Sequence, residues 1–113
     1  KILEIWGSGK PKREVMYVDD IADACIYFMN KKTHHALINV GTGKDMTINQ
    51  FAKFIMKYFK VNLKIKNNKK MPDGVNRKLL DVSLAKKLGW RYKTSLLEGL
   101  KKTHYYFLNN KSK

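Results

Sequence analysis

Apolar residues recur with helical spacing in three stretches of the chain. After the aspartate pair at 19–20 they fall at i, i+3, i+4, i+7 and i+8, the pattern of one buried helix face, and the two carboxylates are expected to cap that helix. Thr47 and Gln50 form a T-x-x-Q capping box ahead of the clearest amphipathic helix. An S-x-x-E box opens a last helix over 95–108. The apolar faces are Ile21, Ala24, Cys25, Phe28 and Met29; Ile48, Phe51, Ala52, Ile55, Met56 and Phe59; and Leu96, Leu97, Leu100, Phe107 and Leu108.

Short runs with strand-like composition or period-two alternation separate these helices. A further short helix is predicted over 83–88, ended by a glycine. Residues 72–74 read Pro-Asp-Gly, a turn in which Gly74 is expected to supply a positive φ. The order of elements predicts a small α/β domain over 1–110, followed by a disordered tail at 111–113. The strands are predicted over 2–6, 14–18, 36–40 and 61–65.

The charge of the chain is strongly positive. A chain of 113 residues is enough for one domain, and the formal net charge of +15 comes from 21 Lys and 3 Arg. These cations are scattered, and no aromatic–basic repeat of an RNA- or DNA-binding module accompanies them. A solvated surface is therefore favoured, and no nucleic-acid partner is expected. A basic nucleic-acid-binding module remains the less favoured alternative, which a continuous basic stripe would support.

Cysteine and histidine give little indication of chemistry. The single Cys25 cannot form an internal disulfide, which fits a reducing cytoplasm, and its helical spacing predicts a buried structural thiol. The adjacent His34 and His35 lack a third ligand at matching spacing, so no metal site is predicted. No apolar run approaches the ~20 residues of a membrane span. Because the chain begins with Lys1 inside a strand-like run, we expect it to be part of a longer soluble protein.

The segment from Trp6 to Arg13 combines an aromatic ring, a glycine turn and cations. Gly7 and Gly9 allow backbone angles that other residues avoid, and Pro11 rigidifies the exit from the turn. A guanidinium beside an aromatic face suits a nucleotide diphosphate. The alternative is that Trp6 is only a packing anchor.

Several motifs together resemble the C-terminal part of the GDP-L-fucose synthase family. These are WGSG-x3-RE-x2-YVDD, INVGTG, TI-x-QFA, PDG-x2-RKLLDVS-x4-LGW and SLLEGL, in that order, between about Leu3 and Asn110. The family consists of extended short-chain dehydrogenases/reductases of the NAD-dependent epimerase/dehydratase type. The resemblance implies the C-terminal substrate-binding lobe of an extended Rossmann fold, with the Rossmann core largely outside this sequence. One departure is Tyr17, which stands where the family usually has a His.

The resemblance also implies an activity. The family converts GDP-4-dehydro-6-deoxy-D-mannose to GDP-L-fucose by epimerising C3 and C5 and reducing C4 with NADPH. An N-terminal Rossmann domain carries the glycine fingerprint, the Tyr-x-x-x-Lys pair and the acid/base Cys and His, and we find no counterpart of these here. The GTG at 41–43 lacks the third glycine of a dinucleotide fingerprint. No catalytic or cofactor-binding residue is therefore assigned, and the full enzyme is expected to be a homodimer. The alternative is the substrate lobe of another nucleotide-sugar epimerase or dehydratase.

The family's substrate contacts, carried over by position, fall on Trp6, Arg13, Asp73 and Lys78. Trp6 offers an aromatic wall, while Arg13 and Lys78 offer positive charge to a diphosphate. Asp73 can accept hydrogen bonds from hydroxyl or guanine donors, although it is equally well explained as a turn residue. Arg77 is the rival of Lys78 as the phosphate contact.

Overall fold

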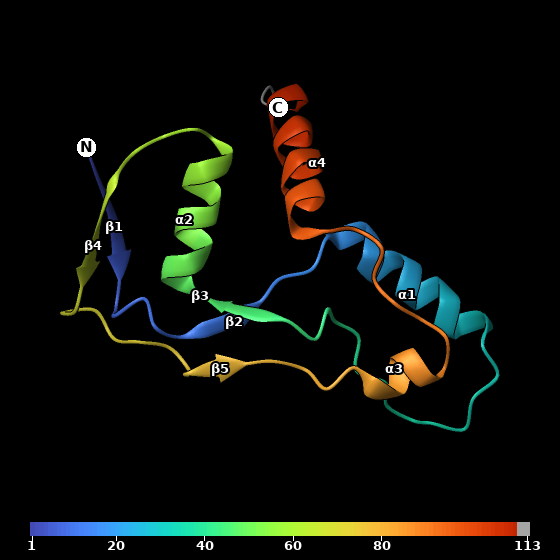
Figure 1. Ribbon diagram of the computed structural model, residues 1–113. Helices are drawn as coiled ribbons and strands as arrows, with labels where there is room; N and C mark the ends of the chain where they lie inside the picture. Colours follow the sequence, from blue (N-terminus) through green and yellow to red (C-terminus); the bar gives the residue numbers. More distant parts are fainter. Residues whose placement is uncertain (111–113) are drawn as a thin grey trace. The chain divides into compact units, whose positions relative to one another are not determined.

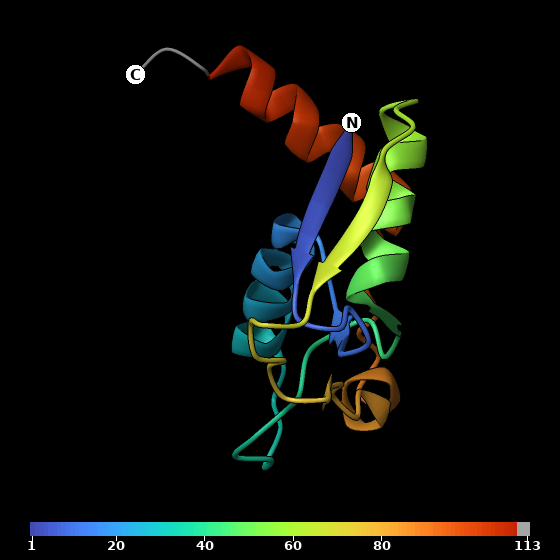
Figure 2. The same ribbon diagram turned by 90° about the vertical axis from the view of Figure 1, so that its left-hand side faces the viewer.

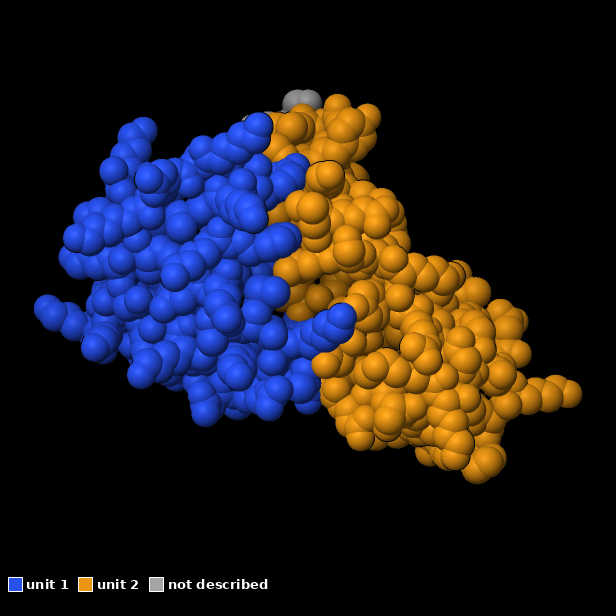
Figure 3. All heavy atoms as spheres, viewed as in Figure 1, with its two compact units in different colours: residues 1–14, 44–79 blue, residues 15–43, 80–113 orange. Residues whose placement is uncertain are grey.

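The computed structural model describes residues 1–110, in which five strands and four helices follow one another (Figure 1). The predicted α/β class is confirmed. The chain divides into two compact units (Figure 3). Unit 1 comprises residues 1–14 and 44–79, and unit 2 comprises residues 15–43 and those from 80 onward. A single domain over 1–110 stays a prediction, and the predicted tail at 111–113 lies outside the described residues.

Unit 1 contains all five strands of residues 1–110, in two small sheets. β1 pairs in parallel with β4, while β2 lies between antiparallel β3 and parallel β5. Helix α2 follows β3 directly and runs beside the β1–β4 pair in both views (Figures 1 and 2). The elements are β1 (Ile2–Trp6), β2 (Lys12–Glu14), β3 (Asp45–Thr47), α2 (Ile48–Tyr58), β4 (Lys64–Asn68) and β5 (Arg77–Lys78).

Local sequence explains the two best-predicted elements of unit 1. The Thr47 hydroxyl accepts from the Gln50 amide at 3.1 Å, and the Gln50 side chain accepts from the Thr47 amide at 2.8 Å, so the predicted capping box is confirmed. In β1, Leu3 and Ile5 are half-buried while Ile2 and Trp6 are exposed. This alternation is the period expected of a strand with one covered face.

Unit 2 is helical, with α1 (Val18–Asn30), α3 (Ser83–Lys87) and α4 (Leu96–Asn109). Its core consists of Ala24, Ala85 and Trp90, which are 1%, 1% and 3% exposed. The Trp90 indole nitrogen donates to a carboxylate oxygen of Asp23 at 2.9 Å, so its polar atom is satisfied within the packed core. Gly89, at φ +98°, ends α3 as predicted.

The aspartates before α1 differ from the prediction. Tyr17 occupies the N-cap position, and no side chain caps this helix. Asp20, only 4% exposed, accepts instead from the backbone amides of Lys93 and Thr94 at 3.3 and 3.0 Å. The prediction that the pair caps α1 was therefore wrong, because the buried carboxylate satisfies amides of the segment that leads into α4.

Two predicted strands form only in part or not at all. Residues 36–40 are not assigned to a strand, although Ile38 and Val40 pack against the unit 2 core while Leu37 is exposed. The predicted strand over 36–40 was therefore wrong, because these residues form no ladder with another described strand. The strand expected over 14–18 instead ends at Glu14, because α1 begins at Val18.

Several apolar positions expected in helix faces are exposed. Cys25 is exposed, so the prediction of a buried thiol was wrong, and Met29 is 85% exposed. Within unit 2, the core touches α1 through Ala24, Tyr27 and Phe28. The last turns of α4 are exposed in the same way. No helix within residues 1–110 combines the length and apolar character that a membrane crossing needs.

Candidate functional site

All four predicted site residues belong to unit 1, on β1, β2, β5 and the loop before β5. Trp6 is the last residue of β1, and its side chain is 69% exposed. The alternative that Trp6 is a packing anchor is therefore wrong for the described residues. The indole stands at a strand end, beside the glycine turn.

The glycine turn after Trp6 brings two distant loops into contact. Gly7 has φ +78°, as its predicted role required, and its amide donates to the Asn68 carbonyl at 2.9 Å. A Cβ on Gly7 would lie 2.2 Å from an Asp73 carboxylate oxygen. Any side chain at position 7 would thus displace Asp73.

Asp73 bonds to the residue that follows Gly7. One carboxylate oxygen accepts from the Ser8 amide at 2.7 Å, and the other accepts from the Ser8 hydroxyl at 2.6 Å. The hydroxyl bond, followed by the amide bond, lowers the pKa of Asp73 below its ordinary value. Asp73 is thus more than a local turn residue. Ser8 was missed from the sequence, and the only available signal was its place inside the WGSG motif.

The N-terminus of α2 holds the other side of the glycine turn. The Asn49 amide donates to the Gly9 carbonyl at 3.1 Å, and the Ile48 amide donates to the Pro11 carbonyl at 3.1 Å. A Cβ on Gly9 would lie 2.1 Å from the Asn49 side-chain oxygen. These first helical amides have no partner within their own helix, so the turn satisfies two of them.

Arg13 is anchored to the same loop as Asp73. Its Nη1 donates to the carbonyls of Lys12 and Val75, each at 2.7 Å. A Cβ on Gly74 would lie 2.9 Å from Arg13 Nη2. Gly74 does not adopt a positive φ, so that prediction was wrong; the glycine instead provides space for the guanidinium.

Strand register separates the two rival cations. In the parallel pair of β2 and β5, Arg13 lies opposite Lys78, and Lys12 lies opposite Arg77. Because neighbouring residues of a strand point to opposite faces, Lys78 shares a face with Arg13 and Arg77 does not.

Arg77 has a carboxylate partner on its own face. Its Nε donates to an Asp45 oxygen at 2.5 Å, and its Nη2 donates to the other oxygen at 3.3 Å. This pair lowers the pKa of Asp45 and raises that of Arg77, in both cases mainly through the hydrogen bond. Arg77 is therefore engaged, and Lys78 is the cation beside Arg13.

Comparison with known proteins places this geometry beside that of similar chains. Residues 1–41 match the NAD dependent epimerase/dehydratase family. The chain is 40% identical over 106 residues to the putative GDP-L-fucose synthase 2 of Arabidopsis thaliana, covering 94% of this chain and 32% of that protein. It is similar to a GDP-L-fucose synthase over nearly its whole length.

Two other proteins widen the comparison. The GDP-L-colitose synthase of Yersinia pseudotuberculosis is 41% identical over 111 residues, covering 97% of this chain and 36% of that protein. The structure of a GDP-mannoheptose C4 reductase from Campylobacter jejuni with NADP bound matches with a TM-score of 0.81 at 32% identity, covering 96% of this chain and 35% of that one. The chain thus spans about a third of the length of its GDP-L-fucose and GDP-L-colitose synthase relatives.

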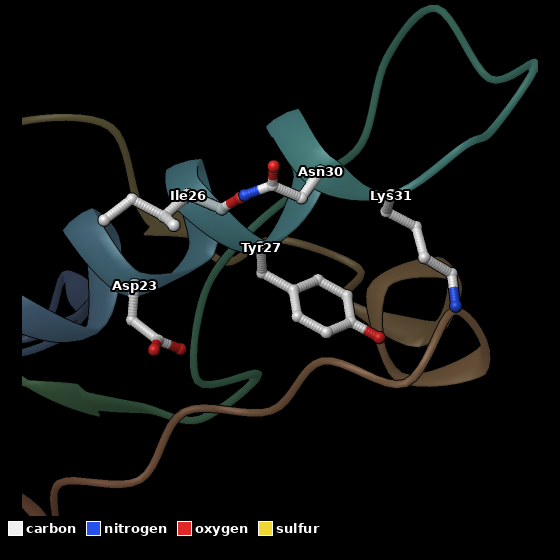
Figure 4. Close-up of a pocket in the computed structure, with 5 residues that line it drawn as sticks. All are labelled: Asp23, Ile26, Tyr27, Asn30 and Lys31. Atoms are coloured by element: carbon white, nitrogen blue, oxygen red, sulfur yellow. The ribbon is translucent and has the colours of Figure 1, made fainter.

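The chain does contain a Tyr-x-x-x-Lys sequence, at Tyr27 and Lys31. The statement that the chain has no counterpart of this pair was therefore wrong as far as sequence spacing is concerned. Figure 4 shows both side chains extending to the same side of α1, where they line a hollow of about 480 Å³. The Tyr27 hydroxyl donates to the Leu88 carbonyl at 2.8 Å, and Lys31 Nζ lies 5.8 Å from the Tyr27 ring centroid. The hydroxyl is thus committed to the backbone that ends α3.

Residues 41–43 do not fit a dinucleotide. A Cβ on Gly43 would lie 2.9 Å from Val82 Cγ2, so this turn packs against a side chain. Close backbone approach to a pyrophosphate needs the glycines of G-x-G-x-x-G at a helix start, and no helix follows here until α2.

Proposed function

We propose that these residues form the GDP-sugar-binding part of a GDP-L-fucose synthase. The complete protein would epimerise C3 and C5 of GDP-4-dehydro-6-deoxy-D-mannose and reduce C4 to give GDP-L-fucose. The similarity to proteins of that name over 94% of the chain supports this activity. In this proposal the complete protein acts in the cytoplasm as a homodimer, without a nucleic-acid partner.

The observation that carries the proposal is the pairing of Arg13 with Lys78 across β2 and β5. A diphosphate brings about two negative charges, and charge-assisted hydrogen bonds from two adjacent cations match it. Arg13 presents a planar fork fixed by the Val75 carbonyl, whereas Lys78 supplies a mobile point charge. The exposed Trp6 indole offers its face to the organic part of the ligand. Asp73 retains lone pairs that can accept from a hydroxyl or a guanine donor.

The reductant in this proposal is NADPH, bound by residues outside these 113. A reductase of similar fold is described with NADP bound, which supports this choice. NADPH would supply a hydride to C4. The residues of this chain bind and orient the GDP-sugar, and no step of proton or hydride transfer is assigned to them.

A second function of the same class is supported by the similarity to the GDP-L-colitose synthase. The diphosphate contacts would be shared, because both names specify a GDP-linked sugar. Product analysis separates the two: GDP-L-fucose from GDP-4-dehydro-6-deoxy-D-mannose supports the first proposal, and turnover of another GDP-4-keto sugar in its place supports the second.

The test uses the full-length protein with NADPH and GDP-4-dehydro-6-deoxy-D-mannose. Arg13→Ala and Lys78→Ala are expected to raise KM, each by an amount equivalent to roughly 1–3 kcal/mol of binding. Lys53→Ala, which removes an exposed lysine of α2, is the matched control and should leave KM unchanged. If Arg13→Ala and Lys78→Ala both leave KM at the wild-type value, the diphosphate site is wrong.

A further inference from the structure

The position of the Trp6 indole is not set by burial in a core. With 69% of its surface exposed, Trp6 gains little from packing within unit 1. A flexible attachment would leave the ring in many orientations, and a ligand would have to bear the cost of ordering it. Its backbone is held on one side by the pairing of Trp6 with Asn68 of β4, and on the other side by the turn that follows it.

Hydrogen bonds to Ser8 determine the shape of that turn. The Ser8 hydroxyl donates to Asp73 at 2.6 Å and accepts from the Lys10 amide at 3.2 Å. The Ser8 amide donates to the second Asp73 oxygen at 2.7 Å. Ser8 therefore links the turn both to itself and to the loop before β5.

The loop that receives Ser8 also receives Arg13. Asp73 accepts from Ser8, and Val75, two residues further on, accepts from the Arg13 guanidinium at 2.7 Å. Gly74 lies between them, and a Cβ there would lie 2.9 Å from Arg13 Nη2. One three-residue loop thus bonds both to the turn that follows Trp6 and to the Arg13 guanidinium.

We infer that Ser8 is a positioning residue for the GDP-sugar site, which places the Trp6 indole through its paired hydrogen bonds with Asp73. This inference rests on the proposed function. Both Asp73 oxygens bond to Ser8, so Asp73 holds the turn in addition to the ligand bond that its remaining lone pairs can accept. Ser8 touches no reacting atom and acts through Trp6.

The first experiment compares Ser8→Ala with wild type in the full-length protein. This change removes the two hydroxyl bonds and keeps the amide bond to Asp73. We expect KM for the GDP-sugar to rise about tenfold with kcat within about twofold, because a bond to a charged acceptor is lost and no catalytic group moves. Ser8→Thr restores the hydroxyl and is expected to return KM to near the wild-type value.

The second readout needs no substrate. In protein labelled with 5-fluorotryptophan, the ¹⁹F resonance of Trp6 is identified by its loss in Trp6→Phe. Ser8→Ala and Asp73→Asn should both shift this resonance in the ligand-free protein, and the double variant should shift it no further, since the two residues act as a unit. Ser95→Ala, which removes a hydroxyl that accepts from the Glu98 amide at the start of α4, is the control and should not shift it.

The outcomes separate this inference from the proposed function. If Ser8→Ala leaves KM and the Trp6 resonance unchanged while Arg13→Ala raises KM, the positioning role is wrong and the function stands. A loss of thermal stability with KM unchanged assigns Ser8 a purely structural role and overturns the inference. If Ser8→Ala cannot be purified, an unshifted Trp6 resonance in Asp73→Asn is sufficient to overturn it. If Arg13→Ala, Lys78→Ala and Ser8→Ala all leave KM unchanged, both proposals fail.

Discussion

Arg13 and Lys78 lie directly opposite each other in the parallel pair of β2 and β5. Arg77, the immediate neighbour of Lys78, lies opposite Lys12 on the other face and is paired with Asp45. The two adjacent cations therefore have different roles. Arg77 stabilises the three-stranded sheet of β3, β2 and β5, and Lys78 adds positive charge next to Arg13.

Exchanging the two cations for alanine should separate these roles. In the full-length protein, Arg77→Ala is expected to lower the thermal unfolding temperature with KM for the GDP-sugar unchanged, because it leaves the buried Asp45 carboxylate without its partner. Lys78→Ala is expected to raise KM for the GDP-sugar and to leave the unfolding temperature unchanged. Calorimetry and initial rates on both variants check this. If KM rose in Arg77→Ala and not in Lys78→Ala, the phosphate contact would be Arg77.

Gly74→Ala should impair binding without unfolding the protein. The added methyl group would lie 2.9 Å from Arg13 Nη2, and the flexible end of Arg13 can move away at little cost. We expect KM to rise about tenfold, approaching the effect of Arg13→Ala, with a small change in unfolding temperature.

The matched control is Val75→Ala. It trims an exposed side chain next to Gly74 and keeps the carbonyl that accepts from Arg13. Its KM should equal that of wild type. Equal KM increases in Gly74→Ala and Val75→Ala would show that the loop responds to any substitution and that the guanidinium contact is irrelevant.

Protonation of Asp45 at low pH should destabilise the three-stranded sheet of β3, β2 and β5. Its folded-state pKa is lowered, so its contribution to stability is present above the unfolded value of about 3.9 and is lost as the pH falls through the lower folded value. Asp45→Asn should therefore be less stable than wild type at pH 7, and this difference should shrink below about pH 4. Unfolding temperatures of both proteins between pH 3 and pH 7 provide the measurement. A difference that does not vary with pH would contradict it.

The 113-residue chain by itself should not reduce the keto sugar. Its GTG turn does not fit a dinucleotide, and its Tyr27 hydroxyl is bonded to the Leu88 carbonyl. NADPH absorbance at 340 nm is therefore expected to stay constant when the purified chain is mixed with GDP-4-dehydro-6-deoxy-D-mannose. Consumption of NADPH above the buffer control would place catalytic groups within these residues.

The sequence was most informative where local rules determine structure. The capping box of Thr47 and Gln50, the first strand and the glycine that ends α3 each follow from residues close together in the chain. Asp20 shows the limit of such rules. A helix-initiating aspartate and one that binds a segment more than 70 residues away have the same local sequence.

The candidate site illustrates the same division. The positions of Trp6, Arg13, Asp73 and Lys78 came from motif resemblance, and their use as substrate contacts remains a proposal. The choice between Arg77 and Lys78 depended on strand register, and Ser8 depended on a bond spanning 65 residues. Strand register and the Ser8–Asp73 bond leave no periodic signal in the sequence, because both depend on which distant segment lies beside the residue.

Strand alternation makes the length of the segment between Pro72 and Arg77 a determinant of charge placement. Deleting one residue there, with the hydrogen-bond ladder of β5 retained, would turn Arg77 toward Arg13 and bring Lys78 beside Asp45. Deleting Val75 or Asn76 would leave the net charge unchanged, yet the spacing of the cations would be altered. Insertions and deletions in this short connection are therefore expected to be more disruptive than most single substitutions within it.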